Sequence, residues 1–258
     1  MKNLSNENIV HVIKEDIQYL QFKKLLEYKD KINHCYTLKE SYEINDGENY
    51  EKLFNELGLK YDGLKRIKYQ AHSDIVEVVN DEIEHTNIDG LVSDKIGITL
   101  SLRFADCTPI YMYDPTKNII GDIHSGWKGT VQKIGQKAVL KMIQEYDCNL
   151  QDIICCIGPC ICEKHFEVHQ DVKDIFEETF SYFENINEMI RKGIVEEGKQ
   201  KYNINLTKIN IKLLEDAGIK RENIIDSKTC TACNSDIMHS YRMDREKAGR
   251  NTAIIGLI

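Results

Sequence analysis

Two histidines and one cysteine in this chain have the side chains that most often bind zinc in proteins. His72 and His124 each end a strand-like run, and Cys107 lies at the outer end of another. Catalytic zinc sites usually have three protein ligands, drawn from imidazoles, thiolates and carboxylates, and leave one position open. The three residues are far apart in the sequence, so two other interpretations stay open. Cys107 can act as a nucleophile with His72 or His124 as its base, or all three can be ordinary structural residues.

A predicted hairpin brings two of these residues together. Strand-like runs at Ile110–Tyr113 and Ile119–Ile123 are separated by a turn rich in Pro and Asn. Cys107 lies before the first run and His124 follows the second. Because paired antiparallel strands bring these ends side by side, we expect Cys107 and His124 to be neighbours.

The residues after His124 predict a glycine-rich turn and then a helix. The turn contains Trp127, the only tryptophan of the chain, and Lys128. Apolar residues recur with helical spacing from Val131 to Ile143, so the helix should start near Thr130. Free N–H groups at a helix start bind anions, and Lys128 and Arg242 would add positive charge there. For Trp127, burial in the core and stacking on a nucleobase are both open.

The remaining pattern predicts a single domain, residues 1–258, of the α+β class with central mixed β-sheets flanked by helices. We find no internal repeat or linker. Further helices are expected over Glu48–Leu59, Asp171–Phe183 and Leu206–Leu214. Further strands are expected over Ile17–Phe22, His34–Leu38, Ile67–His72, Val76–Val79, Ile98–Leu102, Ile153–Ile157, Ile224–Asp226 and Ala253–Ile258. The segment Asn185–Tyr202 is polar, and we expect it to be irregular.

The composition is that of a folded globular protein. The 258 residues are 41% hydrophobic and 29% charged, as in folded globular proteins, and the net charge of −8 argues against binding to nucleic acids or anionic membranes. No signal-peptide pattern or membrane-length apolar run is evident, so we expect a cytoplasmic protein, either a monomer or a homodimer. In that reducing compartment the nine cysteines favour burial, catalysis or metal binding over disulfides.

Five motifs, taken together, resemble the YfiH family, which is also called the laccase-domain, polyphenol oxidase or multifunctional purine nucleoside phosphorylase family. They run in family order from about residue 34 to the end of the chain. The matching segments are Gln70-Ala71-His72-Ser73, Ala105-Asp106-Cys107-Thr108-Pro109-Ile110, His124-Ser125-Gly126-Trp127-Lys128-Gly129, Gly158-Pro159-Cys160-Ile161 with Phe166-Glu167-Val168, and Ser240-Tyr241-Arg242-Met243-Asp244 with Gly249-Arg250.

The resemblance implies a YfiH-like fold and a zinc site made by His72, Cys107 and His124. It also implies phosphorolysis of adenosine, inosine and methylthioadenosine, with some deamination of adenosine, so that a purine nucleoside and phosphate are the expected partners. Lys128 and Arg242 are the further candidate catalytic residues. The alternatives are a copper-dependent polyphenol oxidase, since such a site can also take Cu²⁺, a cysteine hydrolase using Cys107, and a non-catalytic zinc module.

The chain departs from the family pattern at several positions. Lys39 and Lys128 stand where the family has arginine, and lysine lacks the planar fork that binds phosphate in a bidentate manner. Asp106 is a candidate to orient a metal ligand, with a simple turn role as the alternative.

The other cysteines include the spacings Cys160-x-Cys162 and Cys230-x-x-Cys233. For these we expect burial rather than a second, structural zinc site. His165 and His169 lie four residues apart, and we expect them to face solvent.

Overall fold

The computed structural model describes residues 2–14, 17–39, 47–79 and 85–258. Within these residues the strands form two six-stranded sheets and one three-stranded sheet. The first sheet has the order β1 (Ile9–Lys14), β2 (Ile17–Phe22), β3 (Ile32–Thr37), β15 (Asn251–Leu257), β7 (Thr99–Phe104), β4 (Leu64–Arg66). The second has the order β14 (Ile224–Asp226), β10 (Ile154–Ile157), β8 (Thr108–Asp114), β9 (Ile119–Ser125), β6 (Gly90–Ser93), β5 (Val76–Val78).

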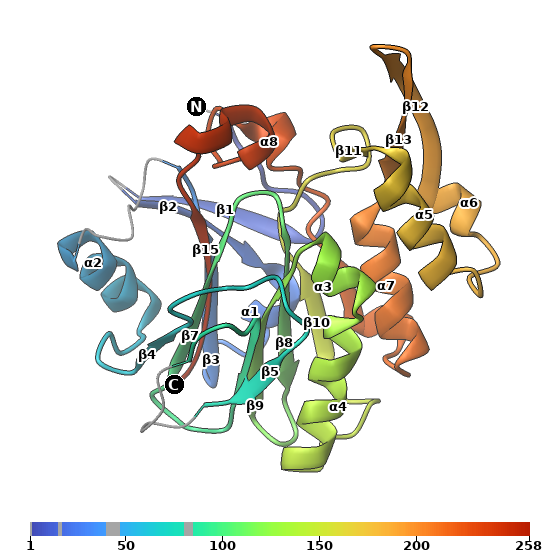
Figure 1. Ribbon diagram of the computed structural model, residues 1–258. Coiled ribbons are helices and arrows are strands. Elements are labelled where there is room, and N and C mark those ends of the chain that lie inside the picture. Colours follow the sequence, from blue (N-terminus) through green and yellow to red (C-terminus); the bar gives the residue numbers. More distant parts are fainter. Residues whose placement is uncertain (1, 15–16, 40–46, 80–84) are drawn as a thin grey trace.

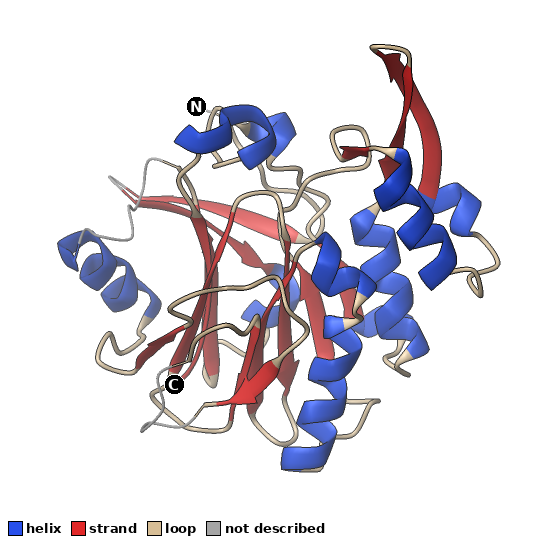
Figure 2. Cartoon of the chain, in the orientation of Figure 1, coloured by secondary structure: helices blue, strands red, loops and turns tan. Residues whose placement is uncertain are grey.

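The two large sheets pack face to face, and helices cover their outer faces (Figure 1, Figure 2). Alternation along single strands produces these layers, because successive side chains of a strand point to opposite faces. In β8, Tyr111 and Tyr113 join the core between the sheets, whereas Ile110 and Met112 join the core beneath the helices α4 (Ile134–Tyr146) and α7 (Leu206–Asp216). Across the first sheet, Ile254 of β15 packs with Leu53 and Phe54 of α2 (Gly47–Leu57).

The region between β9 and α4 corrects one expectation. A short helix, α3 (Trp127–Val131), begins directly after Gly126, and the chain then passes through Lys133, which has a left-handed φ of 64°. The helix predicted to start near Thr130 is therefore two helices. Thr130 lies inside the first, where its buried hydroxyl donates to the Gly126 carbonyl at 3.0 Å. The helix start expected near Thr130 thus lies at Trp127, and anion binding at this helix start stays a prediction.

The segment 185–202, expected to be irregular, is ordered. It contains the short helix α6 (Ile186–Met189), β12 (Ile190–Glu196) and most of β13 (Lys199–Ile204). The strands β12 and β13 form a hairpin that projects from the body, with β11 (Glu167–Val168) on its other side (Figure 1). Most side chains of β12 are exposed, so the strand has no buried face and lacks the alternation that predicts strands.

His72 does not end a strand, contrary to expectation. The strand β4 ends at Arg66, and His72 lies in the following loop with a left-handed φ of 57°. This loop connects β4 of the first sheet to β5 of the second. The other expected strands and helices are present, with ends that differ by up to a few residues, and the helix expected over Asp171–Phe183 is α5 (Gln170–Thr179). The described residues also contain the short helices α1 (Lys23–Leu26) and α8 (Tyr241–Asp244). No helix of the described part is long and apolar enough to span a membrane.

The packing of the sheets buries His34 of β3 in a neutral form. Its ring packs against the rings of Phe22 and Tyr111, and its Nε2 accepts a hydrogen bond from the Phe22 N–H at 2.7 Å. Burial lowers the pKa of His34 to about 3. The unfolded chain therefore binds a proton near pH 6.5 that the folded chain does not accept until about pH 3.

We predict that His34 makes the protein less stable as the pH falls below 6.5. Its contribution to the loss approaches roughly 1.4 kcal/mol per pH unit until the pH nears the folded pKa. In His34→Gln the amide oxygen can still accept the Phe22 N–H but does not titrate. Urea unfolding at pH 7.5 and pH 5.0 should give a smaller pH-dependent loss in this variant, and an equal loss in both proteins would contradict the assignment.

Candidate metal centre

His72, Cys107 and His124 come together at one end of the two large sheets. One ligand atom from each lies within 4.8 Å of those of the other two. The His72 Nε2 is 3.8 Å from the Cys107 Sγ, and the two imidazole rings are 5.0 Å apart between centroids. The predicted hairpin explains half of this arrangement, since β8 and β9 pair with Pro109 opposite His124. The loop after β4 contributes His72.

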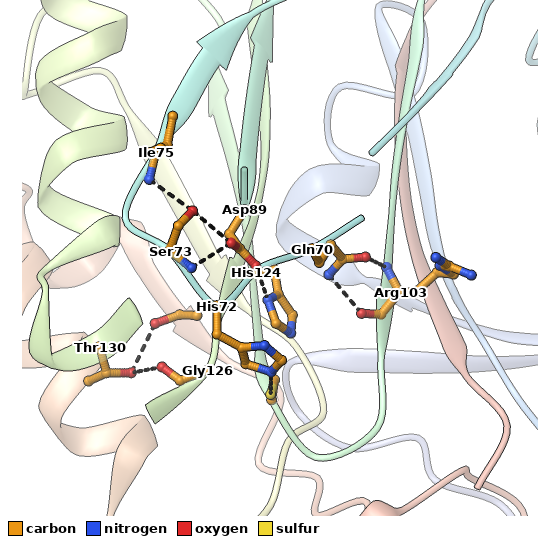
Figure 3. Close-up of polar contacts among 11 residues, drawn as sticks. Gln70, His72, Ser73, Ile75, Asp89, Arg103, His124, Gly126 and Thr130 are labelled. Carbon is orange, nitrogen blue, oxygen red and sulfur yellow. Dashed lines mark hydrogen bonds and ion pairs between the residues drawn. The ribbon is translucent and has the colours of Figure 1, made fainter. Parts of the chain in front are cut away.

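Asp89 holds two of these three segments in place. Its carboxylate is fully buried, and Oδ1 accepts a hydrogen bond from His124 Nδ1 at 2.7 Å (Figure 3). Oδ2 accepts from the N–H of Ser73 at 2.6 Å and from its hydroxyl at 2.8 Å. Because Nδ1 of His124 is occupied by Asp89, its Nε2 is the nitrogen left to bind a metal. A carboxylate behind a ligating histidine is a usual feature of zinc sites.

The sequence did not identify Asp89 as the carboxylate that orients a metal ligand, and Asp106 was the candidate for this role. The carboxylate of Asp106 instead accepts hydrogen bonds from the Thr231 hydroxyl and from the backbone N–H of Arg242, each at 2.6 Å. It has a left-handed φ of 84°. Asp106 therefore links the segment before Cys107 to two C-terminal segments. The signal for Asp89 was weak, because it appears in the sequence only as one acid in a short buried segment.

Two further contacts fix the walls of the centre. A Cβ atom added to Gly126 would lie 2.7 Å from the His72 ring and 3.2 Å from the Cys107 Sγ, so only glycine fits there without moving a candidate ligand. Gln70 exchanges two hydrogen bonds with the backbone of Arg103, at 2.9 and 3.0 Å, and fastens the loop that carries His72 (Figure 3).

The electrostatic setting favours a thiolate at Cys107. Burial alone would raise its pKa, but the neighbouring His124 and His72 lower the pKa to about 6. In turn, burial would lower the pKa of His124, and the Cys107 and Asp89 side chains raise it. A thiolate facing two imidazole nitrogens is a donor set that suits Zn²⁺ and also Cu²⁺.

The three side chains line a pocket of about 1000 Å³. Its wall includes the aromatic side chains of Trp127, Phe166 and Tyr241 and the cationic side chains of Arg103, Lys128, Arg242 and Arg250. Lys128 is exposed and lies 5.7 Å from the centroid of the Trp127 ring. Trp127 is half-buried and packs on Phe176 as well, so it belongs to both the core and the pocket.

The candidate phosphate-binding cations differ in how many hydrogen bonds or ion pairs they already form within the protein. The Arg242 guanidinium donates to the carbonyls of His165 at 2.6 Å and Glu167 at 3.1 Å. Its binding to substrate stays a prediction. Lys39 forms an ion pair at 2.9 Å with Asp244, the last residue of α8. Of Arg242, Lys39 and Lys128, it is Lys128 whose charged group is least engaged in contacts within the protein.

The chain matches a known protein family over most of its length. The family described as multi-copper polyphenol oxidoreductase laccase matches residues 31–258. The chain belongs to this family. The resemblance to the laccase-domain, or YfiH, family is thereby confirmed.

Several relatives in the laccase-domain family have been named as enzymes. A purine nucleoside phosphorylase of Staphylococcus epidermidis is 34% identical over 197 residues, which cover 72% of this chain and 70% of that protein. A purine nucleoside phosphorylase of Clostridium acetobutylicum is 31% identical over 238 residues, which cover 89% of this chain and 94% of that protein.

Solved structures confirm the α+β fold with mixed sheets flanked by helices. The protein YfiH of Bacillus licheniformis superposes with a TM-score of 0.83 at 25% identity and covers 96% of this chain and 99% of its own. The protein YlmD of Geobacillus stearothermophilus superposes with a TM-score of 0.75 at 21% identity and covers 99% of both chains.

We predict that Asp89→Asn weakens zinc binding at the laccase-domain centre by roughly 10- to 100-fold, as is typical when the partner of a ligating histidine is lost. An asparagine amide cannot accept hydrogen bonds from both His124 and Ser73. Competition with a chromogenic chelator measures the affinity. The control is Asp114→Asn, at the far end of β8, where Oδ1 alone accepts from two backbone N–H groups. Equal affinities in the two variants would contradict the role of Asp89.

Proposed function

We propose that this protein is a metal-dependent purine nucleoside phosphorylase, acting on adenosine, inosine and methylthioadenosine, with some adenosine deaminase activity. The observation that carries the proposal is the convergence of His72, Cys107 and His124 on a large pocket with aromatic and cationic walls. The names of the relatives support the same reaction class. The pocket volume is at the upper end of the range usual for small-molecule sites, which suits a nucleoside together with phosphate.

Phosphorolysis sets three requirements for the pocket. The bond between the anomeric carbon and the purine nitrogen breaks, a bond from that carbon to a phosphate oxygen forms, and the purine leaves with the electron pair and takes up a proton. Phosphate must therefore be held beside the anomeric carbon, and the departing base must be stabilised. We assign phosphate binding to Lys128, with Arg242 as a second cation, and contact with the base to the face of Trp127.

The donor set fits a zinc ion held by His72, Cys107 and His124. Two imidazoles and a thiolate are common zinc ligands, and the Asp89 hydrogen bond fixes which nitrogen of His124 faces the centre. When bound, such an ion supplies Lewis acidity toward a substrate oxygen and lowers the pKa of bound water to about 7, as deamination requires. The chain's own residues orient the ligands, exclude water on the Gly126 side and place the cations.

A copper-dependent polyphenol oxidase is less well supported, although the description of the family mentions copper. A multi-copper enzyme needs several histidine-rich sites. Among the described residues, two groups are able to hold a metal. One is the set His72, Cys107 and His124, here called the His72 centre, and the other consists of three cysteines and one histidine. A single copper ion in the His72 centre remains compatible with the donor set.

A cysteine hydrolase is the second candidate, and one observation favours it. The Cys107 thiol has a lowered pKa and lies 3.8 Å from the His72 Nε2, as a nucleophile and its base would. Such an enzyme would use water rather than phosphate as the second substrate. Phosphate dependence therefore separates the two proposals.

We predict that the zinc-loaded protein converts adenosine or inosine to free base and ribose 1-phosphate only when phosphate is present. His124→Ala should lower kcat/KM by roughly a hundredfold or more, because a ligand and the Asp89 contact are both lost. Chromatography of the products measures the activity of the wild type, with and without phosphate, and that of His124→Ala. Base release at the same rate without phosphate, or full activity in His124→Ala, would contradict the proposal.

Lys128 provides a sharper test of phosphate binding. We expect Lys128→Gln to raise KM for phosphate by about tenfold, the size of one charge-assisted hydrogen bond, with little change in KM for the nucleoside. Lys128→Arg should retain binding. The matched control is Lys133→Gln, since Lys133 lies over the Tyr182 ring at 4.9 Å and does not line the pocket. Steady-state kinetics at varied phosphate would decide, and an unchanged KM for phosphate in Lys128→Gln would refute the assignment.

A further inference from the structure

A second group of metal-binding side chains lies beside the pocket. It consists of Cys162, His165, Cys230 and Cys233, here called the cysteine–histidine cluster. One ligand atom from each residue lies within 4.8 Å of all the others. His165 was expected to face solvent, but its Nδ1 contacts three sulfur atoms: Cys162 at 3.4 Å, Cys233 at 3.5 Å and Cys230 at 3.8 Å.

The distances within the cluster match a tetrahedral zinc site. A tetrahedron with Zn–S bonds of about 2.3 Å and a Zn–N bond of about 2.0–2.1 Å places two sulfurs about 3.8 Å apart and each sulfur about 3.6 Å from the nitrogen. The Sγ atoms of Cys162 and Cys233 are 3.9 Å apart, and the three sulfur–nitrogen distances span 3.4 to 3.8 Å. The side chains are thus already arranged around a common centre.

The local backbone has the form that zinc sites built from two turns adopt. Cys162 and His165 are three residues apart on one turn, where the His165 N–H donates to the Cys162 carbonyl. Cys230 and Cys233 have the same spacing on a second turn. The N–H groups of Cys162 and Cys233 both donate to the Cys230 Sγ, at 3.2 and 3.4 Å, which stabilises a thiolate there.

A disulfide explains the cluster less well. Bonded sulfurs are about 2.05 Å apart, so forming one would require movement of Cys162 or Cys233, and one cysteine would remain unpaired. A disulfide would also leave the contacts of His165 with three sulfurs unexplained. Four protein ligands with no open position are typical of structural rather than catalytic zinc.

We propose that Cys162, His165, Cys230 and Cys233 form a second, closed zinc site that fastens one wall of the pocket. Residues of the cluster, or their immediate neighbours, make the contacts that define this wall. The His165 carbonyl accepts a hydrogen bond from the Arg242 guanidinium, and Thr231, next to Cys230, donates to Asp106, next to Cys107. The cluster thereby joins three segments of the chain: the one that leads into β11, the one that leads into α8 and the one before Cys107.

Metal analysis of the purified full-length chain tests this site independently of the proposed reaction. Under reducing conditions, we expect wild type to hold two zinc ions per chain by elemental analysis. Cys107→Ser should retain one ion in the cluster, and Cys162→Ser should retain one in the His72 centre. The matched control is Cys148→Ser, because Cys148 is buried in the core outside both groups and should leave two ions in place.

Cobalt substitution provides a readout that needs no variant of the cluster. In Cys107→Ser loaded with Co²⁺, we expect the intense visible bands of tetrahedral cobalt and a charge-transfer absorption that corresponds to three thiolates. Absence of both the bound ion and these bands in Cys107→Ser would overturn the proposal. So would unchanged zinc content in Cys162→Ser, or a disulfide within the cluster of the reduced, purified wild type. None of these outcomes depends on whether the protein cleaves nucleosides.

Discussion

The buried carboxylate of Asp89 is the constraint on which the candidate centre depends. It makes hydrogen bonds to His124 at the end of β9 and to Ser73 in the loop after β4, so it joins a strand of the second sheet to a loop that comes from the first. A buried charge is costly unless its oxygens are fully paired. Here three hydrogen bonds, one of them from the His124 imidazole, meet that condition, and they hold two of the three ligand segments in one geometry.

The surrounding structure gives the centre an exposed side and a closed side. Cys107 and His124 come from the hairpin β8–β9, which the packing of both sheets immobilises. The backbone of Gly126 closes one side, because a side chain there would displace His72 or Cys107. His72 is the most exposed of the three and lines the pocket.

The cysteine–histidine cluster and the His72 centre illustrate two uses of the same ligand types. Three ligands at a pocket leave room for a substrate, whereas four ligands that enclose a centre leave none. A hydrogen bond links the two groups, from Thr231, next to Cys230, to Asp106, next to Cys107.

Features that depend on a local residue pattern could be predicted from the sequence. The pairing of Cys107 with His124 followed from two short runs and a turn, and most strands and helices followed from their apolar periods. The other features of the candidate centre became evident only from the folded chain. Asp89, the loop position of His72 and the contacts of His165 depend on segments about 35 to 70 residues apart meeting in space. A buried carboxylate or a cysteine has the same local signal whether or not a partner faces it, so only the packing of the sheets and loops identifies that partner.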